Sequence, residues 1–117
     1  MLAALARLFK TPPPEPCWVE IGELRARLAA PAPPMILDVR APGEFNGPLG
    51  HIESSRNIPL PELSAYEAEI AAAGEPVICV CLTDKRSAAA AAQLAAAGVG
   101  KVSVLRGGMK AWREAGL

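Results

Sequence analysis

Residues 77–98 read VICVCLTDKRSAAAAAQLAAAG and join a short apolar run to a long alanine-rich segment. The run at 77–80 is continuously apolar, which favours a strand of a parallel sheet that is covered on both faces. Alanine has the highest helix propensity of all residues, so the segment 87–97 is predicted to be helical. Gly98 is suited to end that helix, because glycine readily adopts the left-handed conformation found there.

The same alternation continues on both sides of this stretch. Apolar runs at 35–39 and 101–105 predict two further strands. Helices are expected at 22–30, where the prolines of 31–34 end the pattern, and at 62–73 and 108–115. Strands that alternate with helices predict a small three-layer α/β domain, with a mainly parallel central sheet and helices on both faces.

Length and composition limit the classes of function. A chain of 117 residues has room for one domain, and 51% hydrophobic residues are enough to form its core. Twelve basic and twelve acidic side chains give a net charge of zero, and only two Trp, two Phe and one Tyr are present. We therefore expect no nucleic-acid partner, and any anion site must come from a local arrangement.

The first sixteen residues differ from the rest of the chain. Residues 1–10 read MLAALARLFK, with one apolar helical face, and the proline-rich spacer TPPPEP follows at 11–16. The apolar run is much shorter than the roughly 20 residues that cross a bilayer, and it lacks the features of a secretory signal. A helix on a membrane surface and a helix packed on the domain or on a partner both fit, and we favour packing. We assign residues 17–117 to the domain and expect no membrane partner.

The three cysteines are Cys17, Cys79 and Cys81. They are too few, and odd in number, for a disulfide scaffold, which indicates reduced thiols in a cytoplasmic protein. A zinc site would have to combine Cys17 with the only histidine, His51, from distant parts of the chain, so we expect no metal site. Cys79 lies inside an apolar run and is expected to be buried and unreactive.

Cys81 lies where parallel sheets bind ligands, at the carboxyl end of a strand and just before a helix. The free N–H groups and the dipole of a helix N-terminus favour negative charge, and Lys85 and Arg86 add positive charge nearby. Such surroundings favour a thiolate, which is the nucleophilic form of cysteine. A buried structural cysteine is the alternative, and position alone does not decide between the two.

Four motifs, in this order and spacing, resemble those of the rhodanese-like domain family. They are DVR at 38–40 with EF at 44–45, GHI at 50–52 with RNIPL at 56–60, Cys81 followed after four residues by Arg86 and Ser87, and VLRGGM at 104–109 with AW at 111–112. The resemblance extends from about residue 19 to residue 117 and therefore covers most of the chain.

The resemblance implies a sulfurtransferase that works through a persulfide on Cys81. The donor would be a small anion such as thiosulfate, or a persulfide, and the acceptor would be cyanide or a thiol, including a protein thiol. The implied substrate-binding residues are Leu82, Thr83, Asp84, Lys85, Arg86 and Ser87. No metal and no organic cofactor is implied.

Two other functions remain open. One is a persulfide relay for a dedicated protein partner, without useful turnover of thiosulfate. The other is a cysteine-dependent phosphatase or arsenate reductase. Phosphatases that resemble this family have one more residue between cysteine and arginine, so the four residues between Cys81 and Arg86 favour a sulfur-sized pocket.

For several other residues near the expected site, the sequence predicts structural roles. Asp84 stands where the family often has glycine, and aspartate tolerates the left-handed conformation better than most residues. Its carboxylate is expected either to be neutralised by Lys85 or Arg86 or to cap the following helix. Asp38 and Arg40 are expected to support the site through an ion pair or through bonds to loop backbone. His51 is expected to be structural, and Gly107 and Gly108 to permit close packing before the last helix.

Overall fold

The computed structural model describes residues 15–117, so the expected helix at 1–10 and most of the proline-rich spacer lie outside the described residues. The elements in chain order are β1 (Trp18–Val19), α2 (Ile21–Leu28), β2 (Met35–Asp38), α3 (Pro42–Phe45), β3 (Arg56–Asn57), the 3₁₀ helix η1 (Leu60–Tyr66), α4 (Glu67–Ala73), β4 (Val77–Val80), α5 (Lys85–Ala96), β5 (Val102–Leu105) and α6 (Gly108–Glu114). Within residues 15–117, no helix is long and apolar enough to cross a membrane.

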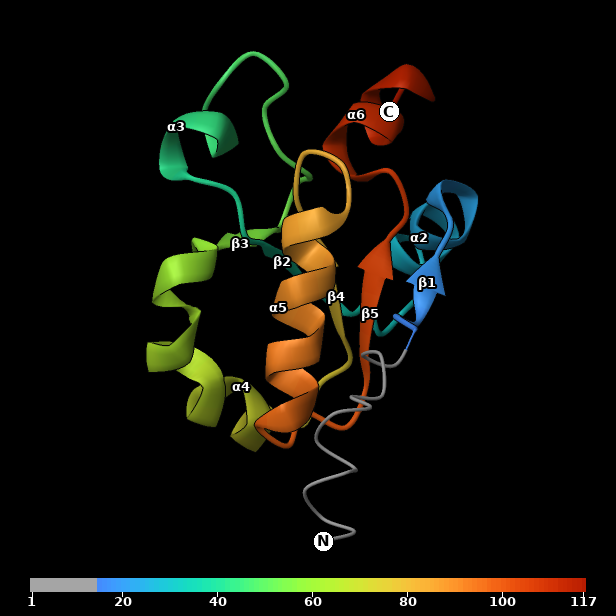
Figure 1. Cartoon of the computed structure of the whole chain (residues 1–117). Coiled ribbons are helices and arrows are strands. Elements are labelled where there is room, and N and C mark those ends of the chain that lie inside the picture. Colours follow the sequence, from blue (N-terminus) through green and yellow to red (C-terminus); the bar gives the residue numbers. More distant parts are fainter. Residues whose placement is uncertain (1–14) are drawn as a thin grey trace, which may run out of the picture.

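The five strands form one sheet in the order β1-β5-β4-β2-β3 (Figure 1). Each of its four strand pairings is parallel. Helices α4 and α5 cover one face, while α2 and α6 lie against the other. The predicted three-layer α/β fold with a parallel sheet is therefore confirmed.

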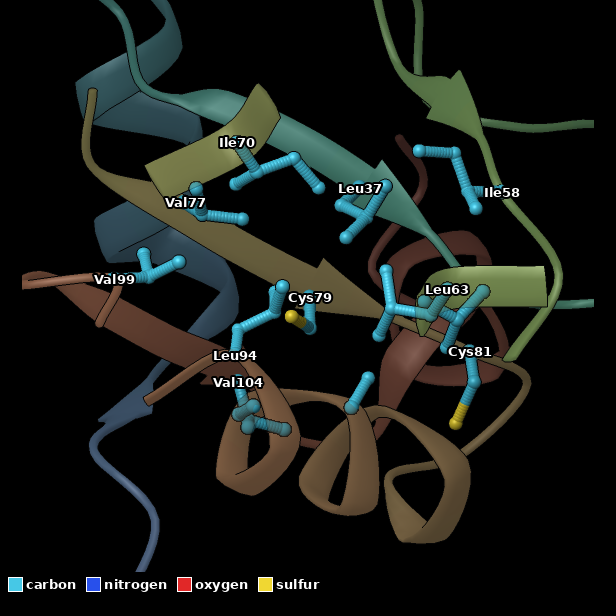
Figure 2. Packing of buried hydrophobic residues seen from close by; sticks show 13 residues of the cluster. Leu37, Ile58, Leu63, Ile70, Val77, Cys79, Cys81, Leu94, Val99 and Val104 are labelled. Atoms are coloured by element: carbon cyan, nitrogen blue, oxygen red, sulfur yellow. The ribbon is translucent and has the colours of Figure 1, made fainter. Parts of the chain in front are cut away.

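Side chains alternate between the two faces along the central strands. Val77 and Cys79 of β4 join the core cluster under α4 and α5, as Figure 2 shows. Ile78 and Val80 join the second cluster, which α2 and α6 complete. All four residues of β4 are buried, which explains why this strand is apolar throughout rather than at alternate positions.

Some predicted boundaries were wrong, and three short elements were missed. Helix α5 begins at Lys85 rather than at residue 87, which places Lys85 and Arg86 in its first turn. The helix predicted at 62–73 is a 3₁₀ helix followed by α4. Strands β1 and β3 and helix α3 have four residues or fewer, too few to show a periodic apolar pattern.

Leu94 provides a test of the contact between α5 and the sheet. Its side chain is fully buried, so replacement by alanine leaves a cavity and should lower the free energy of unfolding by about 2–5 kcal/mol. Urea denaturation measures this loss. The matched control is Leu82→Ala at an exposed leucine, which should change the free energy by less than about 0.5 kcal/mol. Equal losses in the two variants would contradict the described packing.

Candidate active site

Cys81 directly follows β4 at its carboxyl end, and α5 begins at Lys85. The Ser87 N–H donates to the Cys81 Sγ at 3.4 Å, and the Ser87 Oγ lies 3.3 Å from the same sulfur. In Figure 2, Cys81 lies at one end of the core cluster with its sulfur beside the first turn of α5. The thiol therefore lies at a helix N-terminus, where N–H groups and the helix dipole favour an anion.

The other two cysteines lie in different surroundings. Cys79 is fully buried near Leu94 and Val104 (Figure 2), and burial, together with the neighbouring Cys81, raises the pKa of its thiol to about 12. It therefore stays protonated at neutral pH, in line with the expectation of an unreactive cysteine. Cys17 is exposed and precedes β1, so it lies where the parallel strands begin. Cys81 lies at the opposite end of the strands, where β4 finishes. Within residues 15–117, no group of three or more His, Cys, Asp or Glu side chains could hold a metal ion.

The loop after Cys81 is bound to the start of α6. The Met109 N–H donates to the Cys81 carbonyl at 2.9 Å, and the Lys110 N–H donates to the Leu82 carbonyl at 3.0 Å. In a trans peptide the N–H points opposite to the C=O, so the N–H groups of Leu82 and Thr83 point away from α6.

Gly108 makes this close contact feasible. It has a φ of +57°, and a Cβ built on it would lie 2.7 Å from the Leu82 carbonyl oxygen and still closer to the oxygens of Cys81 and Thr83. Any side chain would have to push the loop away. The expectation that this glycine allows close packing before the last helix is confirmed.

Asp84 does not behave as expected. Its Oδ2 accepts the Gly107 N–H at 3.2 Å, across the gap to the start of α6, and its side chain does not cap α5. Within residues 15–117 it forms no ion pair with Lys85 or Arg86. Its φ of −151° also removes the need for a left-handed conformation. The expectation was wrong because the Gly107 N–H at the start of α6 provides a donor across the loop, which local sequence does not reveal.

Arg86 forms a bidentate ion pair with Glu44 of α3. Its Nη1 lies 2.7 Å from Oε1 and its Nη2 lies 2.9 Å from Oε2. The bond to Arg86 lowers the pKa of Glu44 to about 2, against an opposing effect of burial. The same bond raises the pKa of Arg86. Leu82, Thr83 and Lys85 are exposed around this pair.

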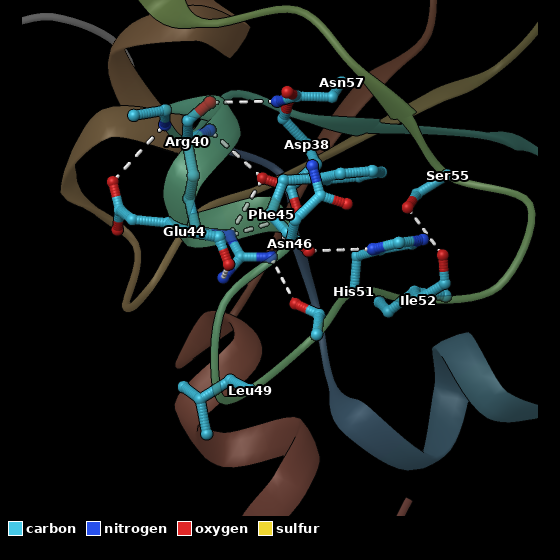
Figure 3. A network of polar contacts seen from close by, with 12 residues as sticks. Asp38, Arg40, Glu44, Phe45, Asn46, Leu49, His51, Ile52, Ser55 and Asn57 are labelled. Atoms are coloured by element: carbon cyan, nitrogen blue, oxygen red, sulfur yellow. Dashed lines mark hydrogen bonds and ion pairs between the residues drawn. The ribbon is translucent and has the colours of Figure 1, made fainter.

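Asp38 and Arg40 form a fully buried ion pair at the end of β2, with 2.8 Å between Oδ2 and Nη2. Arg40 also donates to the carbonyls of Gly50 at 2.7 Å and Glu44 at 3.1 Å (Figure 3). The pair thus fixes the segment that carries Glu44. The structure shows both contacts that the sequence suggested, an ion pair and bonds to loop backbone.

His51 contacts the same segment rather than the thiol. Its Nδ1 lies 2.8 Å from the Phe45 carbonyl oxygen, and its ring stacks on the Phe45 ring at 3.6 Å. Sequence reasoning identifies Glu44 only as part of a motif and misses its place at the site. Its position four residues after Arg40 is the one local indication, because its partner Arg86 lies 42 residues away.

The sequence model of the rhodanese-like domain matches residues 20–115 of this chain. The chain belongs to the rhodanese-like domain family. The rhodanese-like domain is 42% identical over 77 residues to the uncharacterized protein YqhL of Bacillus subtilis, which covers 66% of this chain and 59% of YqhL. It is 37% identical over 83 residues to the uncharacterized protein slr1261 of Synechocystis, which covers 71% of this chain and 45% of slr1261. It therefore spans about half the length of these two relatives.

A solved structure supports the same assignment of the rhodanese-like domain. The crystal structure of a rhodanese-related protein from Thermoplasma volcanium superposes with a TM-score of 0.72 at 30% sequence identity. The match covers 86% of this chain and 93% of that one. The fold is therefore shared over almost the whole described domain.

Gly108→Ala tests the contact between the loop and α6. The variant should lower the free energy of unfolding by about 2–5 kcal/mol, since it combines an unfavourable φ with overpacking against backbone. Thermal or urea unfolding measures the loss. Gly100→Ala is the control, because a Cβ there meets nothing within 4 Å, and its stability should be unchanged or slightly higher. A Gly108 variant as stable as this control would refute the close contact.

The ion pair of Glu44 predicts a specific sensitivity to acid. The folded-state pKa of Glu44, about 2, lies below its ordinary value of 4.5, so its stabilising contribution is present above pH 4.5 and is lost as the pH falls toward 2. Since the pair is partly exposed, we expect the loss to be about 1 kcal/mol. Urea denaturation between pH 5 and pH 2 should show this loss in the wild type and not in Glu44→Gln. The control Glu53→Gln should follow the wild type, and a parallel decline in Glu44→Gln would count against the ion pair.

Proposed function

We propose that the chain is a sulfurtransferase that moves a sulfane sulfur from thiosulfate or a persulfide donor to a thiophilic acceptor through a persulfide on Cys81. The observation that carries this proposal is the position of the Cys81 sulfur beside the Ser87 N–H at the start of α5. We further propose that the N–H groups of Leu82 and Thr83, whose peptide carbonyls are bound by α6, are available to an anionic sulfur on Cys81. A thiolate and a persulfide are both anionic sulfur species, and both are stabilised by such a ring of donors.

The reaction requires two displacements at sulfur. The Cys81 thiolate attacks the outer sulfur of thiosulfate, a new S–S bond forms, and the original S–S bond breaks. Its electron pair leaves with sulfite, so the enzyme retains a persulfide anion. Cyanide or a thiolate acceptor then attacks the outer sulfur of that persulfide. The bond between the two sulfurs breaks toward Cys81, which regenerates the thiolate and releases thiocyanate or a new persulfide.

The remaining residues hold this arrangement in place. Ser87 donates its N–H to the sulfur and places its hydroxyl oxygen 3.3 Å from it. Asp38 and Arg40, which are buried, fix the segment that bears Glu44. Lys85 is an exposed cation in the first turn of α5 and would attract an anionic donor.

A persulfide carrier for one protein partner, with little turnover of thiosulfate, is the second candidate. The Glu44–Arg86 ion pair favours it, because the Arg86 guanidinium in the first turn of α5 already has an anionic partner. The same pair disfavours phosphatase or arsenate reductase activity, in which that arginine would have to bind an oxyanion. A steady-state assay with thiosulfate and cyanide separates the two sulfur-based candidates, since only the enzyme should turn over at a useful rate.

Both candidates predict that Cys81 gains one sulfur atom. Wild-type protein incubated with thiosulfate should show this mass increase by mass spectrometry, and peptide mapping should assign it to Cys81. The Cys81→Ser variant should lose the gain. Cys17→Ser, which removes an exposed thiol, should retain it. Sulfur loading of Cys81→Ser at the wild-type rate would show that the assignment of the nucleophile is wrong.

A further inference from the structure

Leu82 has unusual exposure for its residue type. It is the one large hydrophobic side chain that is exposed within residues 15–117, at 38%, and it directly follows Cys81. Its backbone is fixed, since its carbonyl accepts the Lys110 N–H and packs against Gly108. An apolar side chain is thus held at the candidate site with more than a third of its surface open to solvent. A ligand group that covers this surface would gain the free energy of its burial.

The charges of the segments around Cys81 cancel. The acidic residues are Asp38, Glu44 and Asp84, and the basic residues are Arg40, Lys85 and Arg86. Arg40 is neutralised by Asp38, and Arg86 is neutralised by both oxygens of Glu44. Because these two ion pairs cancel their own charges, a dianion at this site gains little net electrostatic attraction over a monoanion.

We propose that Leu82 and the Glu44–Arg86 pair select the sulfur donor. The preferred class is an organic sulfane-sulfur compound that carries a single negative charge and an apolar group behind the transferred sulfur, rather than the thiosulfate dianion. Glu44 sets the preference for lower charge, because it neutralises the Arg86 guanidinium that would otherwise attract a dianion. Leu82 sets the preference for the apolar group. This inference rests on the proposed function.

Thiosulfate and benzenethiosulfonate form a pair of donors that isolates this difference. In benzenethiosulfonate a phenyl group replaces one sulfonate oxygen, so the molecule carries one charge instead of two. The Cys81 thiolate attacks its outer sulfur, the S–S bond breaks, and the electron pair leaves with benzenesulfinate. The enzyme product is the same persulfide, so differences in kcat/KM report recognition and the leaving group, and changes between variants report recognition alone.

The experiment compares kcat/KM for the two donors, with cyanide as acceptor, in wild type, Glu44→Gln and Leu82→Ser. Removal of the Glu44 charge should raise kcat/KM for thiosulfate about three- to tenfold, and raise that for benzenethiosulfonate less, because the freed Arg86 guanidinium attracts a dianion about twice as strongly as a monoanion. Leu82→Ser should lower the ratio of benzenethiosulfonate to thiosulfate kcat/KM by about threefold or more, since it removes apolar contact. Glu69→Gln, which breaks an exposed ion pair with Arg56 on α4, is the control and should leave this ratio unchanged.

The outcomes separate this inference from the proposed function. If Cys81 gains sulfur but the donor ratio in Glu44→Gln and Leu82→Ser equals that of wild type, donor selection by these residues is refuted while the sulfurtransferase proposal stands. If no donor loads sulfur on Cys81 in the wild type, the proposed function itself fails. Leu82 is exposed, so its variant tests the apolar half of the inference even where Glu44→Gln disturbs α3.

Discussion

The hydrogen bonds from the first turn of α6 to the loop after β4 are the interaction on which the rest of the site depends. The N–H groups of Met109 and Lys110 hold the carbonyls of Cys81 and Leu82, and this fixes which way the loop peptides face. The N–H groups at the opposite ends of those peptides then face away from α6. Only a residue without a Cβ fits between the two segments, and Gly108 is that residue. The last helix of the chain thus positions a loop that lies more than twenty residues earlier in the sequence.

A second constraint comes from paired charges. The buried pair of Asp38 and Arg40 holds the segment after β2, and that segment presents Glu44 to Arg86 at the start of α5. The two pairs link both sides of the candidate site in one network. They also leave the candidate site close to electrical neutrality, so an anion there would be held mainly by backbone N–H groups. This arrangement suits a carried sulfur, which is small and singly charged, better than an oxyanion with several charges.

The elements with strong local signals could be predicted from the sequence. Strand β4 is buried on both faces and therefore apolar throughout, and α5 is rich in alanine, so both could be found from their residues alone. Strands β1 and β3 could not, because two residues carry no period and their pairing is decided by distant partners. The start of α5 was predicted two residues too late. Lys85 and Arg86 are charged and therefore resemble loop residues, but both also have a high helix propensity.

Only part of the candidate site could be predicted from the sequence. The position of Cys81 follows from the order of strand and helix, which is a local property. The partners of Asp84 and Arg86 do not follow from it, because the Gly107 N–H and the Glu44 carboxylate come from segments that only the folded chain brings near. Sequence patterns name the groups at such a site, while tertiary contacts decide which charges are already satisfied.

The sulfur proposed to be carried by Cys81 needs the backbone N–H groups of Leu82, Thr83 and Ser87 as donors. Nitrogen–proton correlation NMR of the protein, recorded before and after persulfide formation, can detect these bonds. We expect the largest downfield shifts of amide protons on Leu82, Thr83 and Ser87, whose N–H groups gain an anionic acceptor. Unchanged resonances for these three amides in fully persulfidated protein would contradict this expectation.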